Sequence, residues 1–568
     1  MERISVGIHT EHNAGMAAVL GGRVVAYCEF ERLTRQKNQA GWMPDIVGDM
    51  LESLDLSRIG AICTPDVEEL RDLLRKRFGG TSVGVSEVVV DRNRIQIYGQ
   101  DNLHPLFHIL AALVLPEMRH GVYGVLVFDA DQPRMGIVDL RGPVRALPAP
   151  RLRVVSSHRW FNGELYADFL GSLFYGGRDL RHCGKLMGLA SWGRSRSDLV
   201  ALLRELAQEA FDPSGRTWQG YSCHNRTAVL RRVRDGTGID PRDHASAQTM
   251  HLAASGQDLF TDELLKQVCE GVSVLANDLR EDGLPDFTGL IYGGGCALSV
   301  VSNSLIRSAI QTAVIAPPYA HDASQFVGAA VLADILSGDG PFPLGLGWAG
   351  IPSHSGGVVT QTQLTDLGLR TTPAVPAEIA RRLASGQLIA LAFGSSEAGP
   401  RALGNRSLIA DPRDGAMRER LNDRVKRREW YRPFAPALPA DAFPAYFGHS
   451  ATTLSTYMLD CMHLRPEHRA ELPAVVTADN SCRPQSVDAH RHPWFHDLLT
   501  AFGQLTGHPV LLNTSLNAPG RPIAYDLAQV MCDCNELGVD AAIVDGAVVE
   551  RGQIAALAMR NRRSNSDV

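Results

Sequence analysis

The apolar and polar positions near the start of the chain follow the pattern of a strand, a polar loop and a hairpin. Ile4–Ile8, Met16–Leu20 and Arg23–Glu29 are mainly apolar, and Gly21-Gly22 separates the second run from the third. Paired glycines accept the positive φ values that a tight hairpin turn requires. The pattern therefore predicts three strands, with His9–Gly15 as a polar loop between the first two.

Further along, the pattern alternates between strands and helices. It predicts strands at Ala61–Cys63 and Gly124–Phe128, with an apolar helix between them that carries His104 and His108. Gly289–Leu298 reads as a buried strand that runs into a glycine turn and then a helix, which presents backbone donors to a phosphate. An early polar hairpin loop and a late glycine turn are how an actin-like ATPase fold holds a nucleotide from two sides. The prediction is an α/β protein with an actin-like N-terminal domain.

Two domains are expected from a chain of 568 residues, within the roughly two to four that its length allows. The first spans residues 1–350. Residues 349–376 are rich in Gly, Ser, Thr and Pro and are predicted to be a linker. A separate α/β domain is predicted from about 377 to 550, within a C-terminal unit that spans residues 377–568. We expect Arg560–Val568 to be a frayed tail.

Composition narrows the class of protein. No apolar run approaches the roughly 18 residues of a membrane span, and the N-terminus lacks an export signal, so a soluble cytoplasmic protein is expected. The ten cysteines include no CxxC pair, which favours reduced thiols. A net charge of −6 gives no global attraction to nucleic acid, so a small anionic substrate fits better than a polyanion.

Two cationic runs predict an anion site. Gly399–Ser407 holds Arg401 and Arg406 among glycines, and Lys426–Pro436 interleaves cations with aromatic residues and prolines. Arginine presents a rigid fork of donors that matches phosphate or carboxylate, and glycine lets backbone N–H groups approach the same anion. The alternative is a basic loop that is merely solvated.

A metal site is a second hypothesis. His104 and His108 are four residues apart and share one helix face. Asp129 follows the next strand, and Asp322 lies just beyond another predicted strand. Two histidines plus carboxylate with open positions suit Fe(II) or a similar divalent ion. The alternative is that both histidines are ordinary core or surface residues.

These residues, together with four further motifs, resemble the O-carbamoyltransferase family that includes nodulation-factor, cephamycin and tobramycin carbamoyltransferases. The further motifs are Glu31–Lys37, Gly184–Ala190, Gly293–Leu298 and Asn513–Asn517. The resemblance covers nearly the whole chain and implies an actin-like (ASKHA), TsaD-like domain joined to a YrdC-like α/β domain. It also implies that carbamoyl phosphate and ATP, the latter with Mg²⁺, form carbamoyl adenylate. The carbamoyl group then passes to an alcohol, as in secondary-metabolite and antibiotic biosynthesis.

The resemblance implies roles for individual residues. Carbamoyl phosphate would be bound by Lys426, Arg432, Arg483 and Ser515. The nucleotide would be bound by Arg401, Gly294, Gly295 and Lys185. A divalent metal, Fe(II) by its ligands, would be held by His104, His108, Asp129 and Asp322. His12 and Lys37 match positions near the transfer site, where a base takes the proton of the acceptor hydroxyl.

Several alternatives remain at this point. His12 could bond its own backbone, and Lys185 could hold a strand–helix turn. The family pattern has His-Asp at His12-Asn13, Lys-His at Lys37-Asn38, and Asp-Gly-x-Gly-Glu from Asp129 onward. These departures could mean a divergent acceptor pocket, an amine acceptor, or the loss of transfer activity. The other functions considered are a threonylcarbamoyl-tRNA-type modification enzyme and a non-catalytic actin-fold nucleotide-binding regulator. A regulator would not need the cations around Lys426 and Arg432.

Overall fold

The structure is a computed structural model. It describes residues 3–54, 58–64, 67–78, 103–129, 133–142, 144, 153–154, 162–177, 179–210, 223–310, 312–337, 342–345 and 357–564. Residues 130–132, where the chain departs from the family pattern after Asp129, lie outside this set, as do 349–356 of the predicted linker. Within the described part, no helix combines the length and the apolar character needed to cross a membrane.

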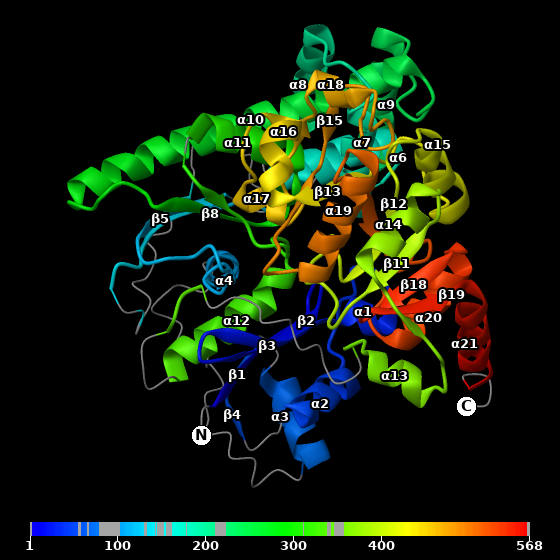
Figure 1. Ribbon diagram of the computed structural model, residues 1–568. Helices are drawn as coiled ribbons and strands as arrows, with labels where there is room; N and C mark the ends of the chain where they lie inside the picture. The colour runs from blue at the N-terminus through cyan, green and yellow to red at the C-terminus, as the bar shows by residue number, and fades with distance from the viewer. Residues whose placement is uncertain are drawn as a thin grey trace.

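A four-stranded sheet forms the N-terminal part of the fold (Figure 1). Its elements are β1 (Ile4–His9), β2 (Gly15–Leu20), β3 (Arg23–Glu29), α1 (Phe30–Thr34), α2 (Pro44–Ser53), β4 (Ile59–Cys63) and α3 (Val67–Phe78). The strand order is β3-β2-β1-β4, with β1 antiparallel to β2 and parallel to β4. Gly21 and Gly22 have φ values of 53° and 76°, so the predicted hairpin is confirmed.

A five-stranded sheet follows. Its elements are α4 (Leu103–Leu110), β5 (Val122–Val127), β6 (Arg134–Asp139), β7 (Arg153–Val154), β8 (Gly289–Gly293), β9 (Val314–Ile315) and α12 (Ala323–Ser337). The strand order is β7-β6-β5-β8-β9, and β5, β8 and β9 are parallel. The helix α12 contacts β1, β2 and β4 of the first sheet as well as α4. It is apolar on nearly every side, as a helix buried between two layers must be.

A group of helices lies between β7 and β9 in the chain. They are α5 (Asn162–Glu164), the π-helical turn η4 (Leu165–Leu170), α6 (Gly171–Tyr175), α7 (Arg181–Ala190), α8 (Ser197–Ala210), α9 (Cys223–Thr237), α10 (Ala247–Glu281), the 3₁₀ turn η5 (Gly295–Leu298) and α11 (Val300–Ile310). The longest is α10, whose 35 residues begin after the N-cap Ser246. It contacts α7, α8 and α11 and forms the long green helix of Figure 1.

An eight-stranded sheet forms the C-terminal part. Its strands are β10 (Thr372–Pro373), β11 (Ile389–Ala392), β12 (Arg406–Ala410), β13 (Ala435–Pro439), β16 (Gln485–Val487), β17 (Leu511–Ser515), β18 (Ala541–Val544) and β19 (Ala547–Glu550). The strand order is β10-β19-β18-β11-β12-β17-β13-β16. The strands β12 and β17 are antiparallel, with Ser407 opposite Ser515. The start of β12 and the end of β17 therefore lie side by side, which brings the Gly399–Ser407 run next to Ser515.

Helices and short turns surround this sheet. They are α13 (Gln361–Asp366), α14 (Pro376–Ala384), α15 (Ala416–Glu419), η6 (Arg420–Val425), η7 (Ala440–Ala442), α16 (Phe443–Phe447), α17 (Thr453–Thr456), β14 (Met462–His463), α18 (Pro466–Arg469), β15 (Ser481–Cys482), α19 (Pro493–Thr506), α20 (Leu527–Leu537) and α21 (Arg551–Ser564). The strands β14 and β15 form a separate two-stranded sheet. In Figure 1, α14 and α19 lie together and α20 lies beside α21, and both pairs are in contact.

Two expectations about segment ends were wrong. Residues 357–376 are not a linker, because α13 and β10 form there and the side chains of Val359 and Leu364 are buried in the C-terminal core. The tail is not frayed from residue 560, because α21 continues to Ser564. In the segment 357–376, the low density of apolar residues concealed short elements that pack through few side chains, such as Val359 and Leu364.

The apolar core that fills the second sheet continues beyond it. The buried side chains of Ala398, Tyr431, Leu454, Tyr457 and Leu459 belong to the same cluster as α4, α10 and α12. The C-terminal region therefore shares packed surface with the N-terminal region and is held against it by apolar contact.

We expect the Gly7→Ala substitution in β1 to destabilise the fold. A Cβ atom at this position would overlap the backbone of α12 at Phe326 and Ala330, which are not free to move aside. We predict a loss of about 2 kcal/mol or more in the free energy of unfolding, measured by urea denaturation. The control is Gly236→Ala in α9, where an added Cβ meets no atom and should stabilise the helix by roughly 0.5–1 kcal/mol. Equal effects of the two substitutions would contradict the close packing of β1 on α12.

Candidate functional site

Four metal-ligand side chains converge between the two N-terminal sheets. His104 and His108 come from α4, Asp129 follows β5, and Asp322 precedes α12. The Nε2 atoms of the two histidines are 3.1 Å apart, and the Nε2 atom of His108 lies 3.4 Å from Oδ2 of Asp129. The Nε2 atom of His104 lies 3.5 Å from Oδ1 of Asp322. All four ligand atoms lie within 4.8 Å of one another, so residues more than two hundred positions apart form one cluster.

The surroundings of this cluster fit a divalent cation. Burial alone would raise the pKa of Asp129, but hydrogen bonds with His104 and His108 hold it well below its usual range. Ser324 Oγ lies 2.5 Å from Nδ1 of His108 and fixes the ring so that Nε2 faces the carboxylates. Such outer contacts orient metal-binding histidines. Two imidazole nitrogens and two carboxylate oxygens form a donor set suited to Fe(II) and similar ions.

Two further histidines lie beside the cluster and were not singled out from the sequence. Burial, followed by the charge of His104, lowers the pKa of His9 to about 4. Burial also lowers the pKa of His321 to about 4, although Glu29 and Asp129 act in the opposite direction. Both therefore remain neutral at pH 7. The sequence did contain a clue to both histidines, because His321 adjoins Asp322 and His9 opens the polar loop that contains His12.

The glycine turn after β8 borders the same cluster. Gly294 has φ 89° and donates its N–H to the Ala320 carbonyl at 2.9 Å. A Cβ at Gly294 would overlap the Phe128 carbonyl, and one at Gly295 would lie 3.1 Å from Oδ1 of Asp129. Only glycine fits this close approach. The predicted glycine turn after β8 is therefore confirmed, and it lies directly against Asp129, one of the predicted metal ligands.

A second group of charges lies in the C-terminal region. Burial, followed by the charges of Arg483 and Arg432, holds the pKa of Arg401 well below its usual range. Burial and Arg432 lower the pKa of Arg483 to about 10. Burial, Arg432 and Arg483 likewise lower the pKa of Arg428, which the sequence reasoning had passed over within the run Lys426–Pro436. The buried Nε atoms of Arg401 and Arg483 have no hydrogen-bond partner within the described residues.

One carboxylate touches the edge of this arginine cluster, which consists of Arg401, Arg428, Arg432 and Arg483. Glu429 lies 3.8 Å from Arg432 and 2.7 Å from Nζ of Lys185. Lys185 lies within α7, so the expectation that it could hold a strand–helix turn was wrong. It instead connects α7 to the cationic loop. One carboxylate shared between two cations leaves most of the positive charge of the cluster uncompensated.

Lys426 and Ser515 meet at the end of β17. The Lys426 ammonium donates to the carbonyls of Ser515 at 2.8 Å and Asn517 at 2.9 Å, and to Oδ1 of Asn517 at 2.6 Å. The hydroxyl of Ser515 donates to the same Oδ1 at 2.6 Å. All three ammonium protons are therefore used in this structure. Burial, together with the charges of Arg428 and Lys37, still holds the pKa of Lys426 well below its usual range.

The other arginine of the run Gly399–Ser407 does not face an anion. The guanidinium of Arg406 is fully buried and donates to the carbonyls of Gly357, Phe393, Gly394, Asn405 and Tyr525. Oε1 of Glu397 accepts the backbone N–H groups of Leu403, Asn405 and Arg406, each at 2.8 Å. Arg406 thus holds the loop together, and Arg401 is the arginine of this run that points to the cluster.

His12 and Lys37 lie on the N-terminal side. His12 is in the turn between β1 and β2, before Asn13, whose φ is 59°. Asn38 after Lys37 has φ 57°. Asparagine, aspartate and histidine all tolerate this left-handed conformation better than most residues, so the backbone suits the residues of the family pattern as well as Asn13 and Asn38. Partial removal from water lowers the pKa of Lys37, Glu31 opposes the shift, and Arg432 adds to it.

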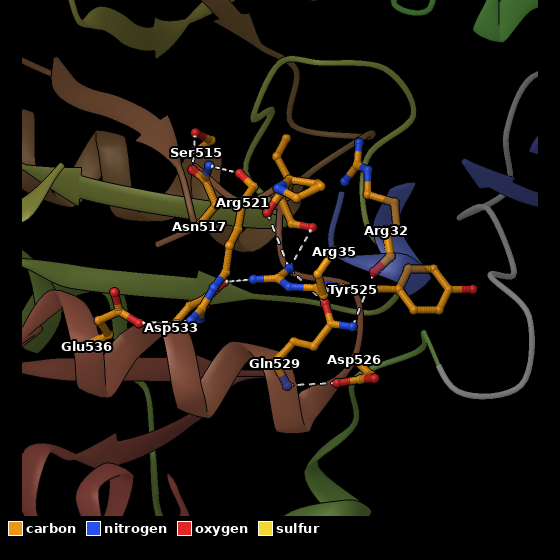
Figure 2. A network of polar contacts seen from close by, with 12 residues as sticks. Arg32, Arg35, Ser515, Asn517, Arg521, Tyr525, Asp526, Gln529, Asp533 and Glu536 are labelled. Atoms are coloured by element: carbon orange, nitrogen blue, oxygen red, sulfur yellow. Dashed lines mark hydrogen bonds and ion pairs between the residues drawn. The ribbon is translucent and has the colours of Figure 1, made fainter. Parts of the chain in front are cut away.

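Polar contacts connect the two regions (Figure 2). The side chain of Arg35 binds Oδ2 of Asp533 at 2.5 Å and Oε1 of Gln529 at 2.8 Å. Arg521 binds Oδ1 of Asp533 at 2.9 Å, and its carbonyl accepts the Asn517 amide at 2.5 Å. Since Asn517 also holds Lys426 and Ser515, an unbroken network runs from the segment after α1 to the end of β17.

A second contact nearby involves a buried ion pair. Glu29 and Arg32 are both buried and lie 3.2 Å apart. Arg32 donates to the Ser396 hydroxyl at 2.9 Å and the Gly399 carbonyl at 2.7 Å, and the Gly399 N–H donates to Glu29 at 3.0 Å. The pair thereby positions the first residue of the run that carries Arg401.

Comparison with known proteins agrees with this chemistry. Residues 380–551 match the family model described as Carbamoyltransferase C-terminus. Nodulation protein U of Sinorhizobium fredii is 32% identical over 354 residues, which cover 61% of this chain and 60% of that protein. The 3′-hydroxymethylcephem-O-carbamoyltransferase of Amycolatopsis lactamdurans is 27% identical over 565 residues, 95% of this chain and 98% of that enzyme. The match to nodulation protein U thus spans about 60% of that relative's length.

A solved structure, component A of the (R)-2-hydroxyglutaryl-CoA dehydratase of Acidaminococcus fermentans, is 10% identical. The alignment covers 58% of this chain and 97% of that one, with a TM-score of 0.31. A likeness at this level carries no argument about the fold or the site.

We expect the Asp322→Asn substitution to weaken metal binding. It keeps the shape of the side chain but removes a negative charge from the four-residue donor set. Iron affinity, measured after anaerobic reconstitution and dialysis, should fall at least about tenfold. Asp286→Asn, at an exposed position, is the control. Iron retention equal to the unmodified protein would refute the site and return both histidines to an ordinary structural role.

The ion pair between Arg35 and Asp533 should couple the two regions. Because the Asp533 side chain is fully buried, we predict that Arg35→Gln costs about 1–3 kcal/mol of unfolding free energy. A double-mutant cycle with Asp533→Asn should give a coupling energy of at least about 0.5 kcal/mol. The exposed pair Asp72 and Arg75 provides the reference cycle, with coupling of at most a few tenths of a kcal/mol. Equal coupling in the two cycles would show that the contact does not hold the regions together.

Proposed function

We propose that this chain, which belongs to the carbamoyltransferase family, is an ATP-dependent O-carbamoyltransferase acting on a small acceptor. In this proposal the N-terminal region, residues 1–350, is the actin-like, TsaD-like transfer domain. The C-terminal region, residues 377–568, is the YrdC-like domain that activates carbamoyl phosphate. Residues 357–376 pack with the latter.

The observation that carries the proposal is the arginine cluster. Placing partly buried guanidinium groups beside one another costs free energy, because each group loses water and repels its neighbours, and a bound anion offsets that cost. Glu429 carries one negative charge, which it shares between Lys185 and Arg432, so it cannot neutralise the four arginines of the cluster. A phosphate dianion supplies the missing charge and accepts several forked hydrogen bonds at once. This supports carbamoyl phosphate as the ligand of the cluster.

The proposed activation step balances as follows. Carbamoyl phosphate and water give carbamate and phosphate, and a carbamate oxygen then attacks the α-phosphorus of ATP, with pyrophosphate leaving. Arg432, Arg483 and the Ser515 hydroxyl bind the phosphate, and Arg401 lies beside the adenylate. Lys426 contributes its charge and holds the loop of Ser515 and Asn517, because its protons are already donated within that loop. Lys426 binds the phosphate directly only if one of its hydrogen bonds to Ser515 or Asn517 is replaced by a bond to the phosphate.

The proposed transfer step uses the N-terminal cluster. Gly294 and Gly295 admit the nucleotide phosphates, and Lys185 binds them if it leaves Glu429. A divalent cation held by His104, His108, Asp129 and Asp322 would supply positive charge to those phosphates when bound, as would the Mg²⁺ that accompanies ATP. The acceptor hydroxyl attacks the carbamoyl carbon, the bond to AMP breaks, and His12 takes the proton. Lys37 stabilises the charge that develops on the departing oxygen.

The acceptor is proposed to be an alcohol of a small secondary metabolite. The support is the full-length match to an enzyme whose name specifies a hydroxymethyl cephem. Incubating the protein with labelled carbamoyl phosphate, ATP and a panel of alcohols and amines tests this directly. Label in an ester together with AMP would support O-transfer, whereas label in a urea-type product would assign an amine acceptor.

We predict that Arg432→Ala lowers the rate of pyrophosphate release from carbamoyl phosphate and ATP by about 30- to 1000-fold. The substitution removes a charge-assisted bond to a buried phosphate, which typically contributes roughly 2–4 kcal/mol. Arg424→Ala is the control, since it removes an equal charge from an exposed position in η6. Its rate should stay within about twofold of the unmodified enzyme, because an exposed charge acts only weakly at a distance. Normal pyrophosphate release by Arg432→Ala would overturn the assignment of this cluster.

A further inference from the structure

A second group of metal-ligand side chains lies outside the sites described above. His468 lies in α18, Glu471 follows that helix, and His508 lies between α19 and β17. Nδ1 of His468 is 3.0 Å from Oε2 of Glu471, and Nε2 of His508 is 3.6 Å from the same oxygen. All three ligand atoms lie within 4.8 Å of one another. Two segments separated by nearly forty residues thus present three donors to one point.

The two imidazoles are held in position by Tyr446. Its hydroxyl lies 3.2 Å from Nδ1 of His508, and its ring stacks on His468 with centroids 4.3 Å apart. When Nδ1 of His508 donates to the Tyr446 oxygen, Nε2 keeps its lone pair for a metal. The backbone N–H of His508 donates to the Thr506 hydroxyl at 3.2 Å. A ligand whose second nitrogen is hydrogen-bonded in this way is typical of metal sites.

We propose that His468, Glu471 and His508 form a Zn²⁺ site that fastens the segment after α18 to the start of β17. Two imidazole nitrogens and one carboxylate oxygen are a donor set that zinc uses, with the fourth position left to water. Glu471 is 47% exposed on its side chain, so that position faces solvent, whereas His508 is only 16% exposed. The site depends on neither the arginine cluster nor the activity proposed above.

The experiment counts Zn²⁺ bound by the full chain. Protein stripped with a chelator is titrated with Zn²⁺ in competition with a chromophoric chelator. We expect His508→Ala and His468→Ala each to bind one fewer Zn²⁺ per chain than the unmodified protein, whatever the N-terminal cluster binds. His490→Ala, an exposed histidine outside the group, should bind the same number as the unmodified protein.

A milder variant separates metal binding from folding. Tyr446→Phe keeps the buried ring and removes only the hydroxyl that orients His508, so Zn²⁺ affinity at this site should fall about tenfold while the number of sites stays unchanged. Circular dichroism of each stripped variant shows whether the fold is intact. The proposal is overturned if His508→Ala and His468→Ala, both folded, bind as many Zn²⁺ ions as the unmodified protein. In that case, His468 and Glu471 form only an ordinary surface ion pair.

Discussion

The C-terminal region brings together four partly buried arginines with only Glu429 as a carboxylate at the edge of the cluster, and much of its local architecture holds these side chains in place. Buried guanidinium groups lose hydration and repel one another, so the loops that carry them would separate if they were not fixed. Glu397 and the fully buried Arg406 fix one loop through backbone hydrogen bonds. The apolar core shared through Tyr431 and Leu459 fixes the other side.

The same constraint explains why the two regions are joined by polar contacts. Arg32 in α1 donates to the carbonyl of Gly399, in the run that carries Arg401. Arg35, directly after α1, pairs with Asp533 in α20. Figure 2 shows Asp533, Arg521 and Asn517 joined by polar contacts. Asn517 in turn accepts a hydrogen bond from the Lys426 ammonium at 2.6 Å. These contacts connect the N-terminal region directly to the loop that holds Lys426 and Ser515.

Local signals in the sequence predicted local structure well. The hairpin at Gly21-Gly22, the helix that carries His104 and His108, and the glycine turn after β8 all rest on patterns within about ten residues. The convergence of Asp322 on the histidines came from the family resemblance, because spacing alone says nothing about residues two hundred positions apart. The sequence could not predict that Arg401 joins the arginine cluster while Arg406 binds backbone carbonyls, because this difference depends on the residue at which β12 begins. The hydrogen bonds of the Lys426 ammonium could not be predicted either, because one of its partners, Asn517, is 91 residues away.

The central proposal is that the partly buried arginine cluster is a phosphate site. Calorimetric titration of the full chain with carbamoyl phosphate, in the absence of ATP, measures this most directly. We expect saturable binding of one molecule per chain, weakened about 10- to 100-fold by Arg483→Ala, since that substitution removes a buried charge-assisted contact. No saturable binding, or equal affinity for the unmodified protein and Arg483→Ala, would contradict the claim.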